Sequence, residues 1–429
     1  MQQPLSRSCC RAKRGNLMQT SVLLKEIATR LAITTFLSLF SSNVHSGEVS
    51  GYLGVQEKLF FEDPLSPIQH NSYLSVVTEP EYFQAWDNNT QELEIRLFYR
   101  VDQYDEQRTH GDIREFSWTG VYDEWEIVAG ISKVFWGVAE TQHLVNIINQ
   151  TDLVENIDAE DKLGQPMLLL STERDWGILD FYILPWFRER TFPGPEGRPK
   201  PNVVFDTDTD AIYDFGAGQD HVDYAVRYSH YQGDWDYAVS FFSGISREPT
   251  DFVPVGVTPI GEPVVVPVYS LINQVGIDSQ AFFGDWTWKI EAINTEARSG
   301  IKDGINSFQT VFGFEYTLVG IADSVVDMGI VVEYHYSDRR IYTNTIFDND
   351  FATALRFVLN DVQSTEILAG ATTDADTQSI GTFIEGSRRL TDSWTLDLQI
   401  RTFHGTKEDK PLYSYRFDNM AQFDLNYHF

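Results

Sequence analysis

The chain has 429 residues, of which 32 are basic and 63 acidic, and its formal net charge is −31. Such an excess of acid argues against nucleic-acid binding, because phosphates need a positive partner surface. Aromatic residues make up 14% of the chain, so it has the means to bury a core and is not a disordered chain. Beyond residue 46 no apolar run approaches the ~20 residues of a spanning helix, which excludes a multi-pass helical membrane protein.

The first 46 residues have the pattern of a targeting segment. Lys25 and Arg30 precede an apolar stretch at 31–40, and the small residues at 44–46 suit cleavage before Gly47. We therefore predict a signal peptide over 1–46, with Met18 as an alternative start that would give it an ordinary length. A buried helix or a membrane anchor is the alternative, but the apolar stretch is too short for an anchor.

Cleavage changes the composition of what remains. Residues 1–46 hold six basic residues and one acidic residue, so the net charge of the remaining chain falls from −31 to −36. Both cysteines, Cys9 and Cys10, lie in the removed segment. An exported chain without disulfides must be held together by core packing or by a membrane.

Apolar and polar residues alternate along the whole remaining chain. The clearest stretches are 93–102, 222–229, 394–401 and 422–429. Successive side chains of a strand point to opposite faces, so each stretch predicts a strand with one apolar and one polar face. A helix would scatter the same residues around its axis.

The connections alternate in length. Gly, Asn and Asp mark short turns, which have the backbone angles that these residues favour, and the intervening polar stretches are much longer. The candidate strands number about 16–18, and most have the 10–14 residues that a tilted strand needs to cross a bilayer. We predict an all-β fold over 47–429, a closed antiparallel transmembrane β-barrel with long extracellular loops and short periplasmic turns. A soluble β-sandwich is the alternative, but its strands would be shorter.

A family resemblance rests on the end of the chain. The last amphipathic strand ends in Phe429, with Tyr427 two places before it. This pattern resembles the C-terminal signature of Gram-negative outer-membrane β-barrel proteins, and it implies an outer-membrane location, contact with outer-membrane lipid and delivery to the barrel-assembly machinery through Phe429. The overall layout is similar to that of porin-type proteins. Residues 135–137 and 146–152 resemble a stretch in uncharacterised exported barrel families, and no motif is specific to one named subfamily.

The segment 138–165 interrupts the alternation. Leu144, Ile147, Ile148 and Val154 have roughly helical spacing. A loop of this length can fold into the lumen and narrow it; the alternative is an extracellular loop over the rim with a short helix beneath it. The candidate constriction-loop residues are His143, Asn146, Asn149, Asp152 and Glu155.

Charged residues recur on the polar faces of the predicted strands. Both signs in one lumen would create a transverse field that orders water and selects polar solutes. The alternative is that these charges pair with one another and hold the barrel in shape. The candidate pore-lining residues are Arg96, Arg100, Arg227, Lys289, Glu291, Asp397 and Arg401.

Other features of the sequence match no known catalytic or metal-binding motif. The acidic run 206–210 lacks the remainder of a calcium-binding loop, and the proline-rich runs 193–201 and 249–267 are predicted to be loops because proline cannot join a strand ladder. The few histidines, His221 beside Asp223 among them, sit in no catalytic motif. We predict no catalytic residue, no bound metal and no cofactor.

The sequence therefore predicts an outer-membrane, porin-like channel for passive diffusion of small polar solutes. A barrel of this strand number leaves an aqueous channel unless loops plug it. The alternatives are a structural or ligand-binding barrel without a transport role and, less favoured, a barrel hydrolase. The expected partners are membrane lipid, the assembly machinery and small polar solutes, and not nucleic acid.

Overall fold

The computed structural model describes residues 47–207, 209–342, 346–405, 407 and 411–429. The predicted signal peptide lies outside these residues. In the described part of the chain, no helix is long and apolar enough to span a membrane.

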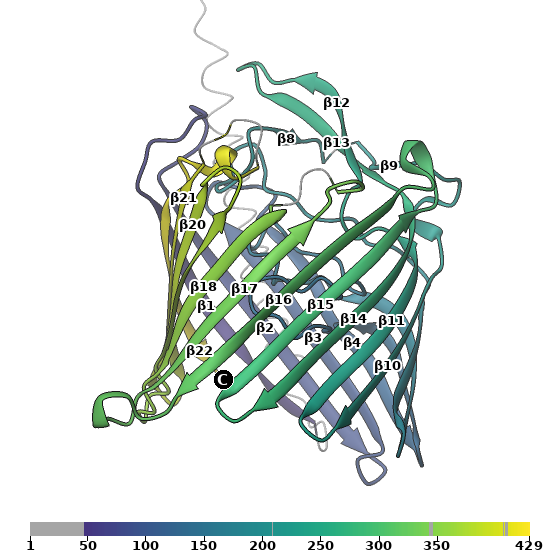
Figure 1. Ribbon diagram of the computed structural model, residues 1–429. Coiled ribbons are helices and arrows are strands. Elements are labelled where there is room, and N and C mark those ends of the chain that lie inside the picture. Colours follow the sequence, from purple (N-terminus) through teal and green to yellow (C-terminus); the bar gives the residue numbers. More distant parts are fainter. Residues whose placement is uncertain (1–46, 208, 343–345, 406, 408–410) are drawn as a thin grey trace, which may run out of the picture. The chain divides into compact units, whose positions relative to one another are not determined.

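Eighteen strands form one sheet, and the chain runs through them in order (Figure 1). They are β1 (Glu48–Phe60), β2 (Ser72–Trp86), β3 (Gln91–Asp102), β4 (His110–Tyr122), β5 (Trp125–Ser132), β6 (Gln165–Arg174), β7 (Gly177–Leu184), β10 (Asp223–Gln232), β11 (Trp235–Ile245), β14 (Leu271–Phe283), β15 (Trp286–Ala297), β16 (Asn306–Leu318), β17 (Asp327–Ser337), β18 (Asn349–Val358), β19 (Glu366–Asp374), β20 (Ile380–Thr391), β21 (Trp394–His404) and β22 (Met420–His428).

The sheet closes on itself. Each strand pairs antiparallel with the next strand of the barrel, and β1 pairs antiparallel with β22, from Tyr52 opposite His428 to Phe60 opposite Met420. Closure leaves no unpaired edge, so all the barrel strands keep their backbone hydrogen bonds. The predicted closed all-β barrel is confirmed, and the strand count lies within the predicted range.

The alternation in the sequence maps onto the two faces of the barrel wall. On β22 the side chains of Phe423, Leu425 and Tyr427 are exposed on the outside. The intervening Gln422 and Asp424 face inward, where Gln56 of β1 donates to Asp424. An apolar outer surface of this kind is stable only in contact with lipid, because water would have to solvate it all round.

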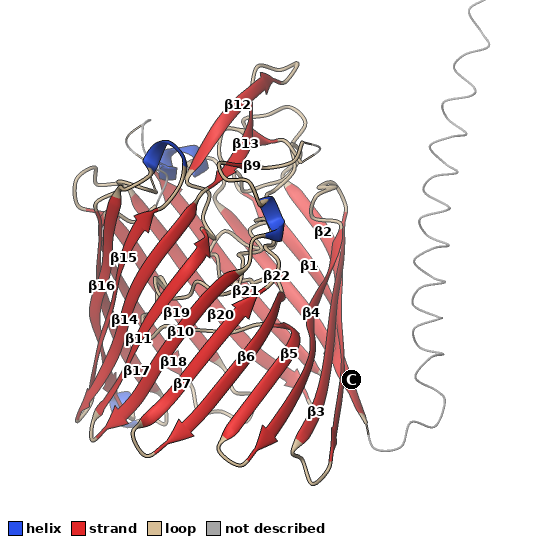
Figure 2. Cartoon of the chain, turned by 90° about the vertical axis from the view of Figure 1, so that its right-hand side faces the viewer, coloured by secondary structure: helices blue, strands red, loops and turns tan. Residues whose placement is uncertain are grey.

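Connections at the two ends of the barrel differ, as Figure 2 shows. The end that we call the short-turn side carries 87–90, 123–124, 175–176, 233–234, 284–285, 319–326, 359–365 and 392–393. The other end, the long-loop side, carries 61–71, 103–109, 133–164, 185–222, 246–270, 298–305, 338–348, 375–379 and 405–419. Short 3-10 turns lie in these connections at η1 (Gly218–Asp220), η2 (Gly300–Lys302), η3 (Ile321–Asp323) and η4 (Pro411–Tyr415).

One proline-rich run was wrongly predicted to be a loop. Residues 249–267 form most of a β-hairpin, β12 (Asp251–Val257) and β13 (Pro263–Tyr269), which stands above the barrel wall (Figure 1). Two short strands, β8 (Val204–Phe205) and β9 (Ile212–Tyr213), pair in parallel with β13. Proline is tolerated because Pro254 lies in the edge strand β12, beside a register shift.

Candidate functional site: the barrel lumen

Residues 133–164, which we call the lumen segment, fold into the barrel instead of lying over its rim. Its first part is held by β15 and β17. Glu291 of β15 accepts backbone N–H groups from Val138 at 2.7 Å, Ala139 at 2.9 Å and Val145 at 3.2 Å. The hydrogen bonds from these three N–H groups are charge-assisted, because their acceptor is an ionised carboxylate. They fix the backbone here more firmly than hydrogen bonds between neutral groups would.

A second carboxylate repeats this arrangement one strand pair further on. Glu333 of β17 accepts the N–H of Glu140 at 2.7 Å and the N–H of Thr141 at 3.0 Å. The Thr141 hydroxyl donates to the same carboxylate at 2.5 Å. The side chains of Glu291 and Glu333 are fully buried. The barrel wall thus supplies the hydrogen-bond partners that this stretch of irregular backbone lacks.

The far part of the segment is held by β1, β3 and β4. The carboxylate of Glu155 lies 2.7 Å from the Arg100 guanidinium and 2.8 Å from His110 Nε2. Lys58 donates to the carbonyl oxygen of Glu155 at 3.3 Å. Burial by itself raises the pKa of Glu155, but Arg100, His110 and Arg108 together hold it well below its ordinary value. Glu155 is therefore an anion at any physiological pH.

A β-bulge in β4 supplies another anchor. The register between β3 and β4 shifts after Arg96, which faces Glu115, so that Leu97 faces Ile113. The extra residue turns both Arg114 and Glu115 inward. Arg114 lies 2.6 Å from the buried carboxylate of Asp152 and donates to the Lys162 carbonyl.

The tip of the segment reaches β21. Asp158 lies 2.8 Å from Arg401, which also contacts Glu385 of β20. The segment therefore touches the wall at β1, β3, β4, β15, β17 and β21, and it crosses the interior of the barrel. Loop traces inside the wall are visible in Figure 2.

Apolar side chains complete the attachment. Val145 and Ile148 are fully buried, and they pack with Trp136 and with inward residues of β6, β7, β11, β14 and β15. The helix-like spacing of Leu144, Ile147, Ile148 and Val154 does not produce a helix: the segment consists of turns, irregular backbone and a β-bridge from Thr151 to Lys162. Anchoring by the wall outweighs the weak local preference for helix.

The long-loop side is covered by the stretch 185–222. The side chain of Arg198 is fully buried and lies 2.8 Å from Asp418. It also donates to the carbonyl oxygens of Glu62, His70 and Phe417. One guanidinium thereby ties three long loops together over β1 and β22.

One sector of the inner wall stays accessible beside the lumen segment. On β14 to β17 the inward side chains Gln274, Asp278, Glu291 and Glu333 are buried. On β19 to β21 Asp374 is buried at the long-loop end, but six inward side chains are only half-buried, and these are Thr372, Phe383, Glu385, Asp397, Gln399 and Arg401. A β-carbon built on Gly381, at the long-loop end of β20, would meet nothing within 4 Å. These side chains are therefore less covered than the four named on β14 to β17, although Arg401 and Gln399 contact Asp158 and Asn156 of the lumen segment.

The facing edge of the lumen segment carries Glu140, His143, Asp158 and Glu160. Glu140 contacts Lys289 of β15 and Arg356 of β18, and His143 Nε2 lies 3.4 Å from the Glu160 carboxylate. Burial by itself lowers the pKa of His143, but the Glu160 hydrogen bond and charge, with Glu291, raise it above its ordinary value.

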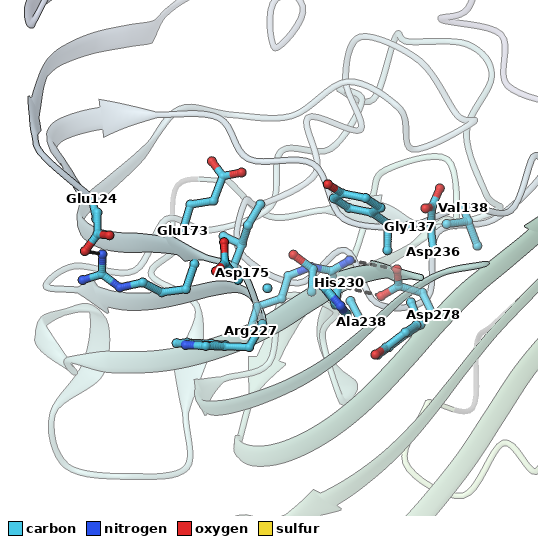
Figure 3. A pocket seen from close by; sticks show the side chains of 17 residues that line it. Glu124, Gly137, Val138, Glu173, Asp175, Arg227, His230, Asp236, Ala238 and Asp278 are labelled. Atoms are coloured by element: carbon cyan, nitrogen blue, oxygen red, sulfur yellow. Dashed lines mark hydrogen bonds and ion pairs between the residues drawn. The ribbon is translucent and has the colours of Figure 1, made fainter. Parts of the chain in front are cut away.

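A pocket of about 770 Å³ opens on the short-turn side, below the start of the lumen segment. Its charged lining, part of which is labelled in Figure 3, comes from the turns and from β6, β10, β11 and β14. Arg227 makes a bidentate contact with Asp278, with both distances 2.8 Å, and Arg174 contacts Glu124. The remaining acidic lining residues are Glu173, Asp175 and Asp236.

The candidate pore-lining residues fall into three groups. Arg100 and Glu291 face inward but are buried against the lumen segment, so they hold it rather than face open space. Arg227 and Lys289 are in ion pairs with Asp278 and with Glu140. The other three members are Arg96, Asp397 and Arg401; they are half-buried like Arg227 and Lys289, and Arg96 and Arg401 are also in ion pairs.

The candidate constriction-loop residues also divide. Asn149, Asp152 and Glu155 are buried and anchor the segment. The side chain of Asn149 accepts a hydrogen bond from the Val134 N–H and donates to the carbonyl oxygens of Ser132 and Leu163. Asn146 accepts a long hydrogen bond from the Trp136 N–H. His143 is half-buried, and its Nε2 lies 3.4 Å from the Glu160 carboxylate.

Sequence reasoning missed several residues that hold or edge the passage, among them Glu333, Arg114, Glu140 and Arg356. A charged residue inside an apolar run was the available signal for Glu333, which follows Ile330, Val331 and Val332. The sequence holds no such signal for Arg114, because the β-bulge breaks the two-residue alternation from which inward-facing positions are predicted.

Among the described residues, no group of three or more His, Cys, Asp or Glu side chains is placed to hold a metal ion. His221 Nδ1 lies 2.8 Å from Asp223, but that carboxylate also binds Arg247 at 2.8 Å. Within the acidic run, Asp206 accepts the N–H and the hydroxyl of Thr209. The prediction that the protein has no catalytic residue stays a prediction.

Comparisons with known proteins identify a fold and no family. No protein-family model and no curated protein matches the chain. A BenF-like porin from Pseudomonas fluorescens superposes with a TM-score of 0.53 at 8% identity, over 90% of this chain and 98% of that chain. A mutant of Rh. blastica porin gives 0.43 at 9% identity, over 89% of this chain and 100% of that chain. OmpT, an outer membrane protein of Vibrio cholerae, gives 0.44 at 9%, over 90% of this chain and 100% of that chain.

Of these structures, the BenF-like porin is similar enough to compare strand by strand. Its likeness extends over nearly the whole of both chains, and it includes the closed antiparallel wall described above. The chain thus has the fold of a porin-like β-barrel.

Proposed function

We propose that this protein is an outer-membrane channel for passive diffusion of small polar solutes. The observation that carries the proposal is the half-buried inner wall of β19 to β21 beside the lumen segment. A wall sealed by the segment would bury these side chains, as it buries Glu291 of β15 and Glu333 of β17. The passage would run past the edge residues Glu140, His143 and Glu160.

The proposed mechanism is physical rather than covalent. The lumen segment sets the width of the passage, and the charges on both of its sides select among solutes that fit. Ion pairs such as Asp158 with Arg401 keep the edge in place beside water. Anchors at Glu291, Glu333 and Glu155 keep the segment from being displaced by solute. The lumen segment is, in this proposal, the constriction loop.

The proposal extends to the location and the partners of the protein. An apolar outer face of exposed side chains suits the lipid of an outer membrane. In that membrane the short-turn side would face the periplasm and the long-loop side the cell exterior. Phe429 at the end of the chain would present the assembly signal to the barrel-assembly machinery.

Conductance of the purified barrel in a planar bilayer tests the proposal. We expect discrete conductance steps and swelling of liposomes that contain the barrel when small sugars or amino acids are added outside. Heat-unfolded protein is the control. Absence of both signals from correctly folded protein would overturn the channel function, and would leave a structural or ligand-binding barrel; lipid or peptide hydrolysis in detergent would point to a barrel enzyme.

A further inference from the structure

The short-turn half of the lumen carries carboxylates in excess of cations. We call the inward-facing members on β2, β3, β5 and β7 the vestibule carboxylates. They lie nearer the short turns than Arg100, where the lumen segment is attached, and all are half-buried. They are Glu79, Glu81, Glu92, Glu94, Glu126 and Asp180.

One guanidinium serves several of these carboxylates. Arg96 lies 2.7 Å from Glu94, 3.1 Å from Glu81 and 4.0 Å from Glu79. This leaves two of the three negative charges uncompensated. In the part of β2 to β7 between Arg96 and the short turns, the one other basic side chain is Arg174, which contacts Glu124 in the turn.

The remaining vestibule carboxylates have neutral partners or none. Asp180 accepts a hydrogen bond from the Ser171 hydroxyl at 2.6 Å, and it stands across from Arg227 in the strand register without forming an ion pair with it, since Arg227 is bound to Asp278. Glu92 and Glu126 are in no ion pair among the described residues. In the adjoining pocket, the carboxylates of Glu173 and Asp175 also lack an ion-pair partner in the described part of the chain.

The opposite wall repeats the pattern. Asp397 of β21 and Asp424 of β22 stand directly across from each other in the strand register. Asp397 accepts from the Ser387 hydroxyl at 2.6 Å and from the Asn426 amide at 3.1 Å. Asp424 accepts from the amides of Gln56 and Gln422. Amide and hydroxyl donors satisfy these oxygens without cancelling their charge.

Of the other basic side chains in the lumen, three lie farther from the short turns and are in ion pairs. Arg100, Arg108 and Arg114 are buried at the level of the lumen segment, where they bind Glu155, Asp102 and Asp152. A solute in the short-turn half therefore meets accessible carboxylates, while the basic side chains Arg96, Arg174 and Arg227 there are held in ion pairs. Walls of low dielectric focus such a field and raise the local concentration of ions of opposite sign.

We infer that the channel passes small cations, organic ammonium ions included, in preference to anions, and that the vestibule carboxylates set this preference. The inference rests on the proposed channel function and names its solute class. Reversal potentials of the full barrel across a KCl gradient test it. We expect potassium to be more permeant than chloride by at least about threefold at low salt.

A charge-neutralising pair and a matched control locate the effect. Replacing Glu92→Gln and Glu126→Gln removes two vestibule charges without breaking an ion pair, and we expect the potassium-to-chloride ratio to fall by about half. The control carries Glu106→Gln and Asp303→Asn, which removes two charges from exposed residues of long loops. We expect the control to keep the ratio of the unmodified barrel.

Salt dependence gives a second measurement that needs no variant. Raising KCl from 0.1 to 1 M shortens the Debye length from ~10 Å to ~3 Å, so the ratio should approach one. A barrel that conducts but prefers chloride would overturn the inference alone. So would a barrel whose potassium-to-chloride ratio changes neither in the Glu92→Gln, Glu126→Gln variant nor with salt concentration. A barrel that never conducts would overturn the proposed function instead.

Discussion

The carboxylate of Glu155 and the guanidinium of Arg100 meet at 2.7 Å inside the barrel, with 4% and 6% of their side chains exposed. Glu155 belongs to the lumen segment and Arg100 to β3, so this contact joins the segment to the wall. Arg108 and His110 share the same carboxylate. An anion placed among so many donors is the strongest charged anchor of the segment.

Replacing Glu155→Gln should loosen the far part of the lumen segment. Arg100 and Arg108 would then be buried without their full charge partner, which costs about 3–5 kcal/mol for an ion pair broken from one side. We expect a lower unfolding temperature in detergent and larger, noisier conductance steps. Glu106→Gln, an exposed change in a neighbouring loop, is the control. Unchanged conductance and stability would show that Glu155 does not hold the segment.

Glu291→Gln should release the near part of the segment. The amide keeps the size of the side chain but turns an NH₂ group toward backbone N–H donors that now bind Glu291. Each lost charge-assisted hydrogen bond costs about 1.5–3 kcal/mol. We expect faster proteolysis within 138–145. Glu296→Gln on the same strand, where the carboxylate is 42% exposed, is the matched control; equal proteolysis of both variants would contradict the assignment.

The contact of His143 with Glu160 should depend on pH. The pKa of His143 in the folded protein is raised above its ordinary value and that of Glu160 is lowered. A raised histidine pKa stabilises the folded state at low pH, and this stabilisation is lost as pH rises through the raised value. We expect conductance noise to increase as pH rises through the raised pKa of His143. His143→Gln should abolish the pH dependence and Glu160→Gln should move it to lower pH; an unchanged profile in both would refute the role.

A large side chain at Gly381 should narrow the passage without unfolding the barrel. The added atoms would enter open space beside β20. We expect Gly381→Trp to reduce single-channel conductance by half or more, while the unfolding temperature stays unchanged. Gly256→Trp places the same side chain on the hairpin strand β12, where a β-carbon meets only Val264 at 4.0 Å. Equal conductance of the two variants would mean that solutes do not pass this sector.

Phe429→Ser should slow insertion into the membrane and leave the folded barrel nearly as stable. The Phe429 N–H bonds to the Gly51 carbonyl through the backbone, which serine keeps. Its ring is half exposed, so little packing is lost. Pulse-chase measurement of heat-modifiable, folded barrel is the test. Lipid-facing Leu425→Ala is the control, and similar kinetics in both variants would argue against a signal at Phe429.

The sequence by itself determined the wall of the barrel. A strand places residues two apart on one face, so the alternation in 422–429 or 394–401 fixes which side chains meet lipid and which meet the interior. The positions of the short turns and most long loops follow from the same pattern. These features depend on residues that are neighbours in the sequence, so the sequence alone is enough to predict them.

Only the tertiary structure decided what each inward charge does. Arg100 and Arg401 look alike in the sequence, yet one is buried by Glu155 and the other lies half-buried beside Asp158 and Glu385. Their partners are 55 and 243 residues away in the chain. The fold of the lumen segment has the same cause, because its backbone is held by wall carboxylates such as Glu291 and Glu333 rather than by bonds to its own neighbours.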